Sequence, residues 1–211
     1  MYSLYKILKY IPIILVTINF ILFLSQYKKE NRTYKIYTVY LGLIVFIELS
    51  SRVLIANGYQ NLMLSHLYFT GQFVMLSLFY LQLLKENYQK KIVKFNLVVI
   101  PLLLIVNFSV FPSQLHEFSM VEILLTSITV ISYSTFHFYN MLSHKKEFYL
   151  INCGILIYLF GSTVTFLPRN LHVTYGKSLS IVLTILNILL YIVYLIFIFL
   201  EWRQIKTRNK G

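Results

Sequence analysis

Several ionisable residues, among them Glu48, Arg52 and His66, lie inside strongly apolar stretches, where a charge is costly and usually has a partner or faces a cavity. Glu48 and Arg52 are four residues apart, so on a helix they lie one turn apart in the order that favours an ion pair. His66 follows in the next apolar stretch. We expect one polar layer of these three side chains. Glu48 would pair with Arg52, hydrogen-bond His66, or act as a proton carrier or ligand anchor, and Arg52 would otherwise reach the headgroups.

Deeper polar faces have helical spacing. One face comprises Asn61, Ser65, Tyr68 and Gln72, at steps of four, three and four residues. Two other runs have similar faces. One comprises Ser180, Thr184, Asn187, Tyr191 and Tyr194. The other comprises Glu122, Thr126, Thr129, Tyr133 and His137. Such faces indicate either a central polar cavity with Gln72 and Thr184 near mid-membrane, or polar contacts that hold helices together. The candidate ligand-binding or proton-coupling residues are Glu48, Arg52, His66, Tyr68, Gln72, Glu122, Thr184 and Asn187.

The composition argues against several kinds of chemistry. The chain has no Asp, which excludes two-aspartate mechanisms, and Cys153 is its one cysteine, which excludes a disulfide within the chain. The His residues have no convincing metal-ligand spacing. We therefore assign no catalytic residue and expect neither a metal nor a cofactor.

These residues are positioned by seven apolar runs that fill most of the chain. A bilayer core of roughly 30 Å requires about 20 mostly apolar helical residues. The runs are continuously apolar rather than alternating, so they predict helices and not a barrel. The predicted spans are Ile11–Gln26, Ile36–Ala56, Asn61–Leu84, Val93–Phe111, Ser119–Leu142, Phe148–Leu167 and Ser178–Glu201. We expect one all-α, polytopic membrane domain over residues 1–211.

Charge is distributed unevenly between the two ends of these spans. Most Lys and Arg residues lie in the connections 27–35, 85–94 and 143–147 and after residue 201, whereas the other ends carry Lys6, Lys9, Arg52, Arg169 and Lys177. Lys and Arg are retained on the cytoplasmic side, which predicts an outside N-terminus and an inside C-terminus. The net charge of +12 therefore indicates topology and anionic-lipid contact, not nucleic-acid binding.

Seven spans can divide into three, a linker and three. A shift of 112 positions places Gly42 on Gly154 and Gln72 on Thr184. This predicts parallel half-repeats at 10–85 and 119–201, joined by a peripheral linker helix at 93–112 that faces lipid. Parallel repeats around a site at the membrane midplane are common in transporters.

The residues from Phe46 to Leu84 resemble a group of uncharacterised bacterial seven-helix membrane proteins, through Glu48, Asn61, His66 and Tyr68. That resemblance implies the seven-helix fold and no known activity. Glu48 to Arg52 is also similar to the E-x-x-x-R element of CAAX-protease-like glutamate intramembrane proteases, which implies a Glu that activates water beside His residues. The three-one-three layout is similar to SWEET-type sugar transporters and to the transporter–opsin–receptor grouping.

We expect a multi-pass protein of the cell membrane, with the bacterial cytoplasmic membrane as its location. Its leading function is the binding of a small molecule in a polar intramembrane cavity, as a transporter or as the sensory subunit of a signalling pair. A membrane-embedded hydrolase and a non-catalytic assembly subunit are the alternatives. The expected partners are the lipid bilayer, a small-molecule ligand, and a membrane protein or a second copy of the chain.

Overall fold

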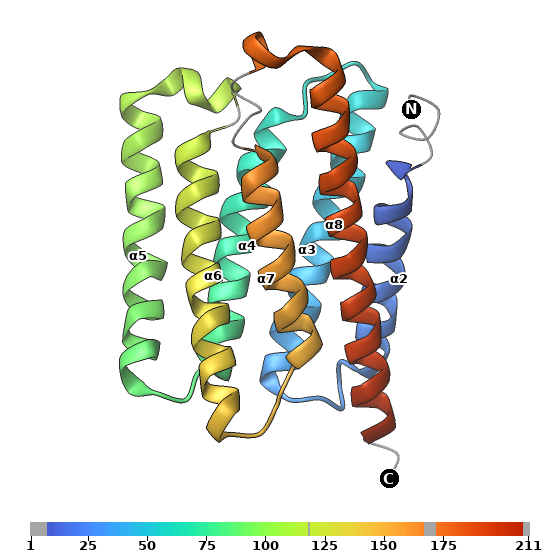
Figure 1. Cartoon of the computed structure of the whole chain (residues 1–211), viewed down its shortest axis with the longest axis vertical. Coiled ribbons are helices and arrows are strands. Elements are labelled where there is room, and N and C mark those ends of the chain that lie inside the picture. The colour runs from blue at the N-terminus through green and yellow to red at the C-terminus, as the bar shows by residue number, and fades with distance from the viewer. Residues whose placement is uncertain (1–7, 118, 167–171, 209–211) are drawn as a thin grey trace.

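A computed structural model describes residues 8–117, 119–166 and 172–208, and these residues form an all-helical bundle (Figure 1). The long helices are α2 (Ile11–Gln26), α3 (Arg32–Ala56), α4 (Leu62–Leu83), α5 (Asn87–Val110), α6 (Met120–Ser143), α7 (Tyr149–Phe166) and α8 (His172–Arg208). A short 3₁₀ helix, η1 (Pro112–His116), follows α5. Every predicted span thus corresponds to a helix.

Six of the described helices are long and apolar enough to cross a membrane, which is consistent with a polytopic membrane protein. The helix α2 is apolar but has 16 residues, because polar residues follow Gln26 and precede Ile11. At 1.5 Å per residue it is shorter than a bilayer core of roughly 30 Å. The helix has the predicted bounds, and its length sets it apart from the six helices that are long enough to cross a membrane.

Local sequence explains where several helices begin. Pro12 occupies the first turn of α2, where its missing N–H removes no intrahelical bond. The Asn31 side chain accepts a hydrogen bond from the Tyr34 N–H at 2.9 Å, so α3 begins before the predicted apolar run. Ser119 caps α6 in the same way, through the Glu122 N–H at 3.3 Å.

Six helices form a closed ring in the order α2, α3, α4, α6, α7 and α8, with α8 packed back on α2. The helix α5 lies outside this ring, where it packs on α4 and α6 at one edge of the bundle (Figure 1). This placement agrees with the predicted peripheral position of the fourth apolar run. The large apolar side chains exposed around the bundle, such as Ile14, Phe46, Phe95 and Val193, suit contact with lipid.

The ring has the same order of contacts in its two three-helix halves, since α2–α3–α4 is matched by α6–α7–α8. The glycines that the predicted repeat superimposes differ in their neighbours. Gly42 faces the Phe20 ring of the first helix in its half, whereas Gly154 faces Tyr194 of the last helix in its half. The half-repeat therefore stays a prediction.

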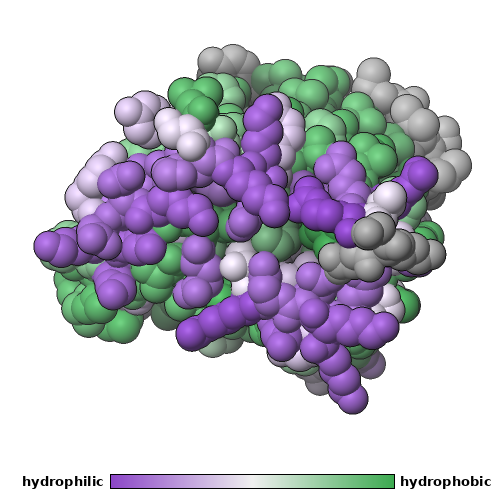
Figure 2. Space-filling view, turned by 90° about the horizontal axis from the view of Figure 1, so that it is seen from below, coloured by the Kyte–Doolittle hydropathy of each residue, from purple (hydrophilic) through white to green (hydrophobic). Residues whose placement is uncertain are grey.

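The two ends of the bundle differ in polarity. The connections between α2 and α3, α4 and α5, and α6 and α7 lie at the same end as the C-terminus (Figure 1). Viewed from that end, hydrophilic residues form a broad band across the face, with apolar residues at its edges (Figure 2). We call this end the basic end, because it carries most of the Lys and Arg residues of the chain.

Candidate functional site

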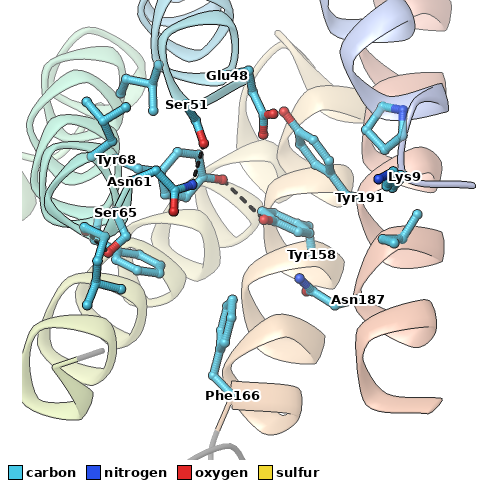
Figure 3. A pocket seen from close by; sticks show the side chains of 16 residues that line it. Lys9, Glu48, Ser51, Asn61, Ser65, Tyr68, Tyr158, Phe166, Asn187 and Tyr191 are labelled. Carbon is cyan, nitrogen blue, oxygen red and sulfur yellow. Dashed lines mark hydrogen bonds between the residues drawn. The ribbon is translucent and has the colours of Figure 1, made fainter. Parts of the chain in front are cut away.

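A cavity of about 300 Å³ lies inside the helix ring near the end opposite the basic end (Figure 3). It is bounded by residues of α3 and α4 on one side and of α7 and α8 on the other, with Lys9 and Pro12 near the start of α2. We call it the outer cavity. Its polar and aromatic lining comprises Glu48, Ser51, Asn61, Ser65, Tyr68, Phe69, Tyr158, Phe166, Asn187 and Tyr191.

The predicted polar face of α4 forms one wall of the outer cavity, since Asn61, Ser65 and Tyr68 all line it. The Asn61 amide donates to the Ser51 hydroxyl at 2.5 Å, which joins the start of α4 to the end of α3. Across the cavity, the hydroxyls of Tyr68 and Tyr158 are 3.1 Å apart (Figure 3). These contacts hold opposite walls of the cavity in place.

Gln72 lies one turn below this wall and is buried. Its amide nitrogen donates to the Tyr40 hydroxyl at 2.9 Å and reaches the Tyr68 hydroxyl at 3.4 Å. It does not line the outer cavity. Gln72 is therefore placed to orient two tyrosines rather than to contact a ligand.

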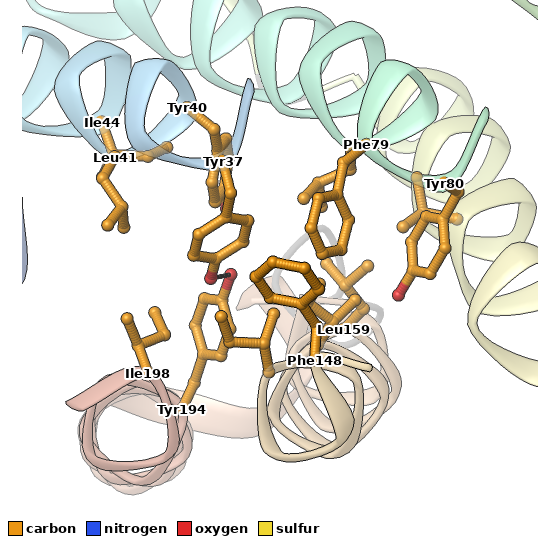
Figure 4. Packing of buried hydrophobic residues seen from close by; sticks show 14 of the residues in the cluster. Tyr37, Tyr40, Leu41, Ile44, Phe79, Tyr80, Phe148, Leu159, Tyr194 and Ile198 are labelled. Atoms are coloured by element: carbon orange, nitrogen blue, oxygen red, sulfur yellow. Dashed lines mark hydrogen bonds between the residues drawn. The ribbon is translucent and has the colours of Figure 1, made fainter. Parts of the chain in front are cut away.

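A layer of aromatic side chains packs in the ring nearer to the basic end. Tyr37 and Tyr194 are almost fully buried, and their hydroxyls meet at 2.8 Å (Figure 4). The ring centroid of Phe79 is 5.1 Å from that of Tyr37 and 5.4 Å from that of Phe148. We call Tyr37, Phe79, Phe148 and Tyr194 the aromatic floor, because they fill the ring between the outer cavity and the basic end.

Glu48 lines the outer cavity, but it does not form the expected ion pair with Arg52. Among the described residues, the one ion pair within 4.0 Å joins His66 and Glu122. Arg52 instead donates to the Lys9 carbonyl at 3.0 Å and lies over the Tyr10 ring, 5.0 Å from its centroid. The side chain of Arg52 thus covers the N-terminal segment before α2.

His66 forms its contacts away from Glu48, so the predicted layer of Glu48, Arg52 and His66 is not one hydrogen-bonded unit. Its Nδ1 atom lies 2.5 Å from a Glu122 carboxylate oxygen, and its Nε2 atom lies 3.2 Å from the Leu115 carbonyl oxygen. The other carboxylate oxygen of Glu122 accepts from the Thr70 hydroxyl at 2.8 Å. Because Glu122 is fully buried between α4 and α6, it joins these helices and does not reach the interface.

The two predicted residues of α8 lie in different surroundings. The Thr184 hydroxyl donates to the Ser180 carbonyl of its own helix at 2.8 Å, and Thr184 does not line the outer cavity. Asn187 does line it, and its buried Oδ1 atom has no hydrogen-bond partner among the described residues. A buried polar atom without a partner is unfavourable, so a hydrogen bond from a ligand or a water molecule that reaches this oxygen would be stabilising.

Sequence reasoning found Glu48 on α3 but missed Tyr37 and Tyr40, which the same helix contributes. Tyr37, Tyr40, Ile44, Glu48 and Ser51 follow one another at steps of three or four residues, which places them on one helical face. All but Ile44 contact the outer cavity, the aromatic floor or Gln72. This spacing was the signal that would have found Tyr37 and Tyr40 beside Glu48.

The described residues contain no group of three or more His, Cys, Asp or Glu side chains that could hold a metal ion. Cys153 is a free, partly exposed thiol on α7. Arg169, one of the few basic residues at the less basic ends of the predicted spans, lies outside the described residues. The polar groups that line the outer cavity are thus the Glu48 carboxylate, the Lys9 ammonium, amides and hydroxyls, a set that suits an organic molecule.

The chain matches no protein-family model, no curated protein and no solved structure. The assignment of a function therefore rests on the chemistry of the site.

Proposed function

We propose that this chain is an integral membrane protein that binds a small molecule in the outer cavity, as a transporter or as the sensory subunit of a signalling pair. The observation that carries this proposal is the outer cavity itself, about 300 Å³ of space lined by polar and aromatic side chains. Ligand sites are concave, largely apolar and furnished with a few polar groups, and this half-open cavity has the same character.

The charge distribution supports an orientation for this site. With the basic end in the cytoplasm, the N-terminus and the outer cavity face outward. The membrane that we propose for a bacterial cell is the cytoplasmic membrane. A Cys153→Ser protein with Asn57→Cys, between α3 and α4, should react with a membrane-impermeant thiol reagent in intact cells. The matching Lys146→Cys protein should react only after the cells are opened, and the reverse pattern would contradict the orientation.

The aromatic floor separates the outer cavity from the basic end, as the inner gate of a transporter in its outward-facing state would. Transport then requires the Tyr37–Tyr194 contact to open, and a ligand drives that change only if it binds the two states with different affinity. A sensory subunit requires only that the ligand shift helix packing against a partner. Hydrolysis by Glu48 with His66 is less well supported, because both ring nitrogens of His66 already contact other groups.

Mass spectrometry of molecules that co-purify with the protein tests this proposal. The wild type is compared with Ser65→Phe, which places a ring in the outer cavity. The matched control is Ser132→Phe, since Ser132 is exposed on the outside of α6 and bonds only its own helix. A compound present in the wild type and in Ser132→Phe, but depleted from folded Ser65→Phe, is the expected result. Identical profiles in all three proteins would reject binding in this cavity.

A further inference from the structure

Glu48 is the one acidic residue among the described residues that line the outer cavity. No basic side chain pairs with it within 4.0 Å in the described part of the chain. Two basic residues belong to this region. Arg52 acts on Glu48 through its charge and donates to the Lys9 carbonyl, and the Lys9 ammonium lies 5.0 Å from the centre of the Tyr10 ring, although Lys9 also lines the cavity. A carboxylate inside a membrane bundle normally has a partner, and Glu48 forms no salt bridge with a described residue, so it can take a cationic group of a ligand as its partner.

Aromatic rings stand beside this carboxylate. Figure 3 shows the Glu48 carboxylate and the Tyr191 hydroxyl pointing toward one another across the cavity. The Tyr191 and Tyr158 rings are 5.1 Å apart between centroids, and both line the cavity. The face of an aromatic ring attracts a cation, and the attraction is stronger in sites shielded from water.

The remaining polar groups suit a ligand that carries a further polar group. The Asn187 Oδ1 atom accepts hydrogen bonds and has no partner among the described residues. An ammonium N–H or an attached hydroxyl could donate to it. The volume of about 300 Å³ is at the lower end for ligand pockets, which favours a small molecule or the headgroup of a lipid.

We propose that the outer cavity binds a small organic ammonium group, with Glu48 as its counter-ion and with Tyr158 and Tyr191 as its aromatic wall. This inference rests on the proposed ligand-binding function and names the chemical class of the ligand. The ammonium group belongs either to a free amine or to an amine-bearing phospholipid headgroup, which present the same chemistry to the site.

Calorimetric titration of the full-length protein tests the inference, in nanodiscs of phosphatidylglycerol, which has no amine. Choline and ethylammonium are the cationic probes, and 3,3-dimethyl-1-butanol is the uncharged analogue of choline. We expect the wild type to bind a cationic probe. The uncharged analogue should bind at least about tenfold more weakly, a difference of ~1.4 kcal/mol or more in the free energy of binding. Equal affinity for choline and its analogue, or no heat from either cation at millimolar concentration, would overturn the inference.

Variants show whether the predicted groups carry the affinity. Glu48→Gln should weaken cation binding about tenfold or more, whereas Glu117→Gln should bind as the wild type does. Glu117 is the matched control because it is an exposed acid outside the cavity lining. Tyr191→Leu should weaken binding and Tyr191→Phe should not, since Phe keeps the ring face. Wild-type affinity in folded Glu48→Gln would contradict the role of Glu48.

The two proposals fail in distinguishable ways. If the cationic probes do not bind while a co-purified compound still disappears from Ser65→Phe, the cavity binds a ligand of another class. Nanodiscs that contain phosphatidylethanolamine separate the two sources of the ammonium group. Loss of choline binding in them identifies the headgroup as the occupant, and unchanged binding identifies a free amine.

Discussion

The buried contact between His66 and Glu122 allows a quantitative prediction. The Leu115 carbonyl oxygen, 3.2 Å from Nε2 of His66, can only accept a hydrogen bond, so Nε2 must carry a hydrogen. The contact between Nδ1 and the Glu122 carboxylate oxygen, at 2.5 Å, then requires a second proton on one of these two atoms. With the proton on either atom, the pair as a whole is neutral.

This arrangement predicts that Glu122→Gln is much milder than Glu122→Leu. The amide nitrogen of Gln can donate to Nδ1 as a protonated carboxyl does, and its oxygen can still accept from Thr70. We expect a cost of about 1 kcal/mol in the free energy of unfolding. Leu would leave the Nδ1 atom of His66 and the Thr70 hydroxyl unpaired in a buried site, at a cost of about 3 kcal/mol.

A double-mutant cycle measures the interaction itself. His66→Leu alone leaves a buried Glu122 without its partner and should cost about 3 to 5 kcal/mol. In the double variant, each substitution removes the group that the other leaves unpaired. The loss in the free energy of unfolding should therefore be about 2 kcal/mol smaller than the sum of the losses in the two single variants. Near-ultraviolet circular dichroism during titration of mixed micelles with dodecyl sulfate reports the free energy of unfolding.

The neutral pair of Gln89 and Asn140 is the control for this cycle. Their side-chain amides exchange two hydrogen bonds, at 2.7 and 3.2 Å, in a similarly buried position between α5 and α6. Hydrogen bonds of this kind in membrane proteins average about 0.6 kcal/mol. A coupling at His66 and Glu122 no larger than this control, or equal damage from Glu122→Gln and Glu122→Leu, would refute the reasoning.

Two further substitutions test the packing that holds the aromatic floor and the basic end. A Cβ atom added at Gly154 would lie 2.7 Å from the Tyr194 ring, so Gly154→Ala should cost about 1 to 3 kcal/mol and alter the tyrosine signal in near-ultraviolet circular dichroism. Asn152→Leu should cost about 2 to 3 kcal/mol in the same unfolding titration, because the Asn152 Oδ1 atom accepts from the Tyr80 hydroxyl at 2.7 Å and from the Ser134 hydroxyl at 3.0 Å. Wild-type stability in either variant would contradict the corresponding contact.

The helices were predictable because lipid leaves the backbone few alternatives. An apolar run must satisfy its own N–H and C=O groups, so length and composition alone indicate a helix. The residues from Ile11 to Gln26 form a helix with the predicted bounds. The helix α8 extends beyond the predicted span at both ends, because polar residues that flank an apolar run can continue a helix outside the lipid.

The partners of the polar side chains were not predictable, because they depend on which helices are neighbours. Glu122 follows His66 by 56 residues, and their contact exists because α5 lies outside the ring and leaves α4 packed on α6. The similar depth of Glu48 and His66 in the membrane suggested that their side chains meet. Depth gives a layer in the membrane, whereas a hydrogen bond also requires the correct face of each helix.

The same limit applies to the centre of the site. Gln72 and Thr184 were predicted at the middle of a symmetric cavity, and the structure places each against other side chains or its own backbone. Their helical neighbours Tyr68 and Asn187 line the cavity instead. A shift of one turn along a helix decides whether a side chain lines the cavity or packs beside it. The sequence pattern does not resolve a position more finely than one turn.

Thiol labelling at Ser65 tests most directly whether the outer cavity faces the outside. The Ser65→Cys substitution is made in a Cys153→Ser protein. In intact cells, the new thiol should react with the membrane-impermeant reagent 2-(trimethylammonium)ethyl methanethiosulfonate. This cationic reagent should react faster than the anionic sulfonatoethyl reagent does. Ser132→Cys, on the outside of α6, should stay unmodified because lipid covers it. Absence of reaction at Ser65→Cys, or reaction only after the cells are opened, would contradict an outward-facing ligand cavity.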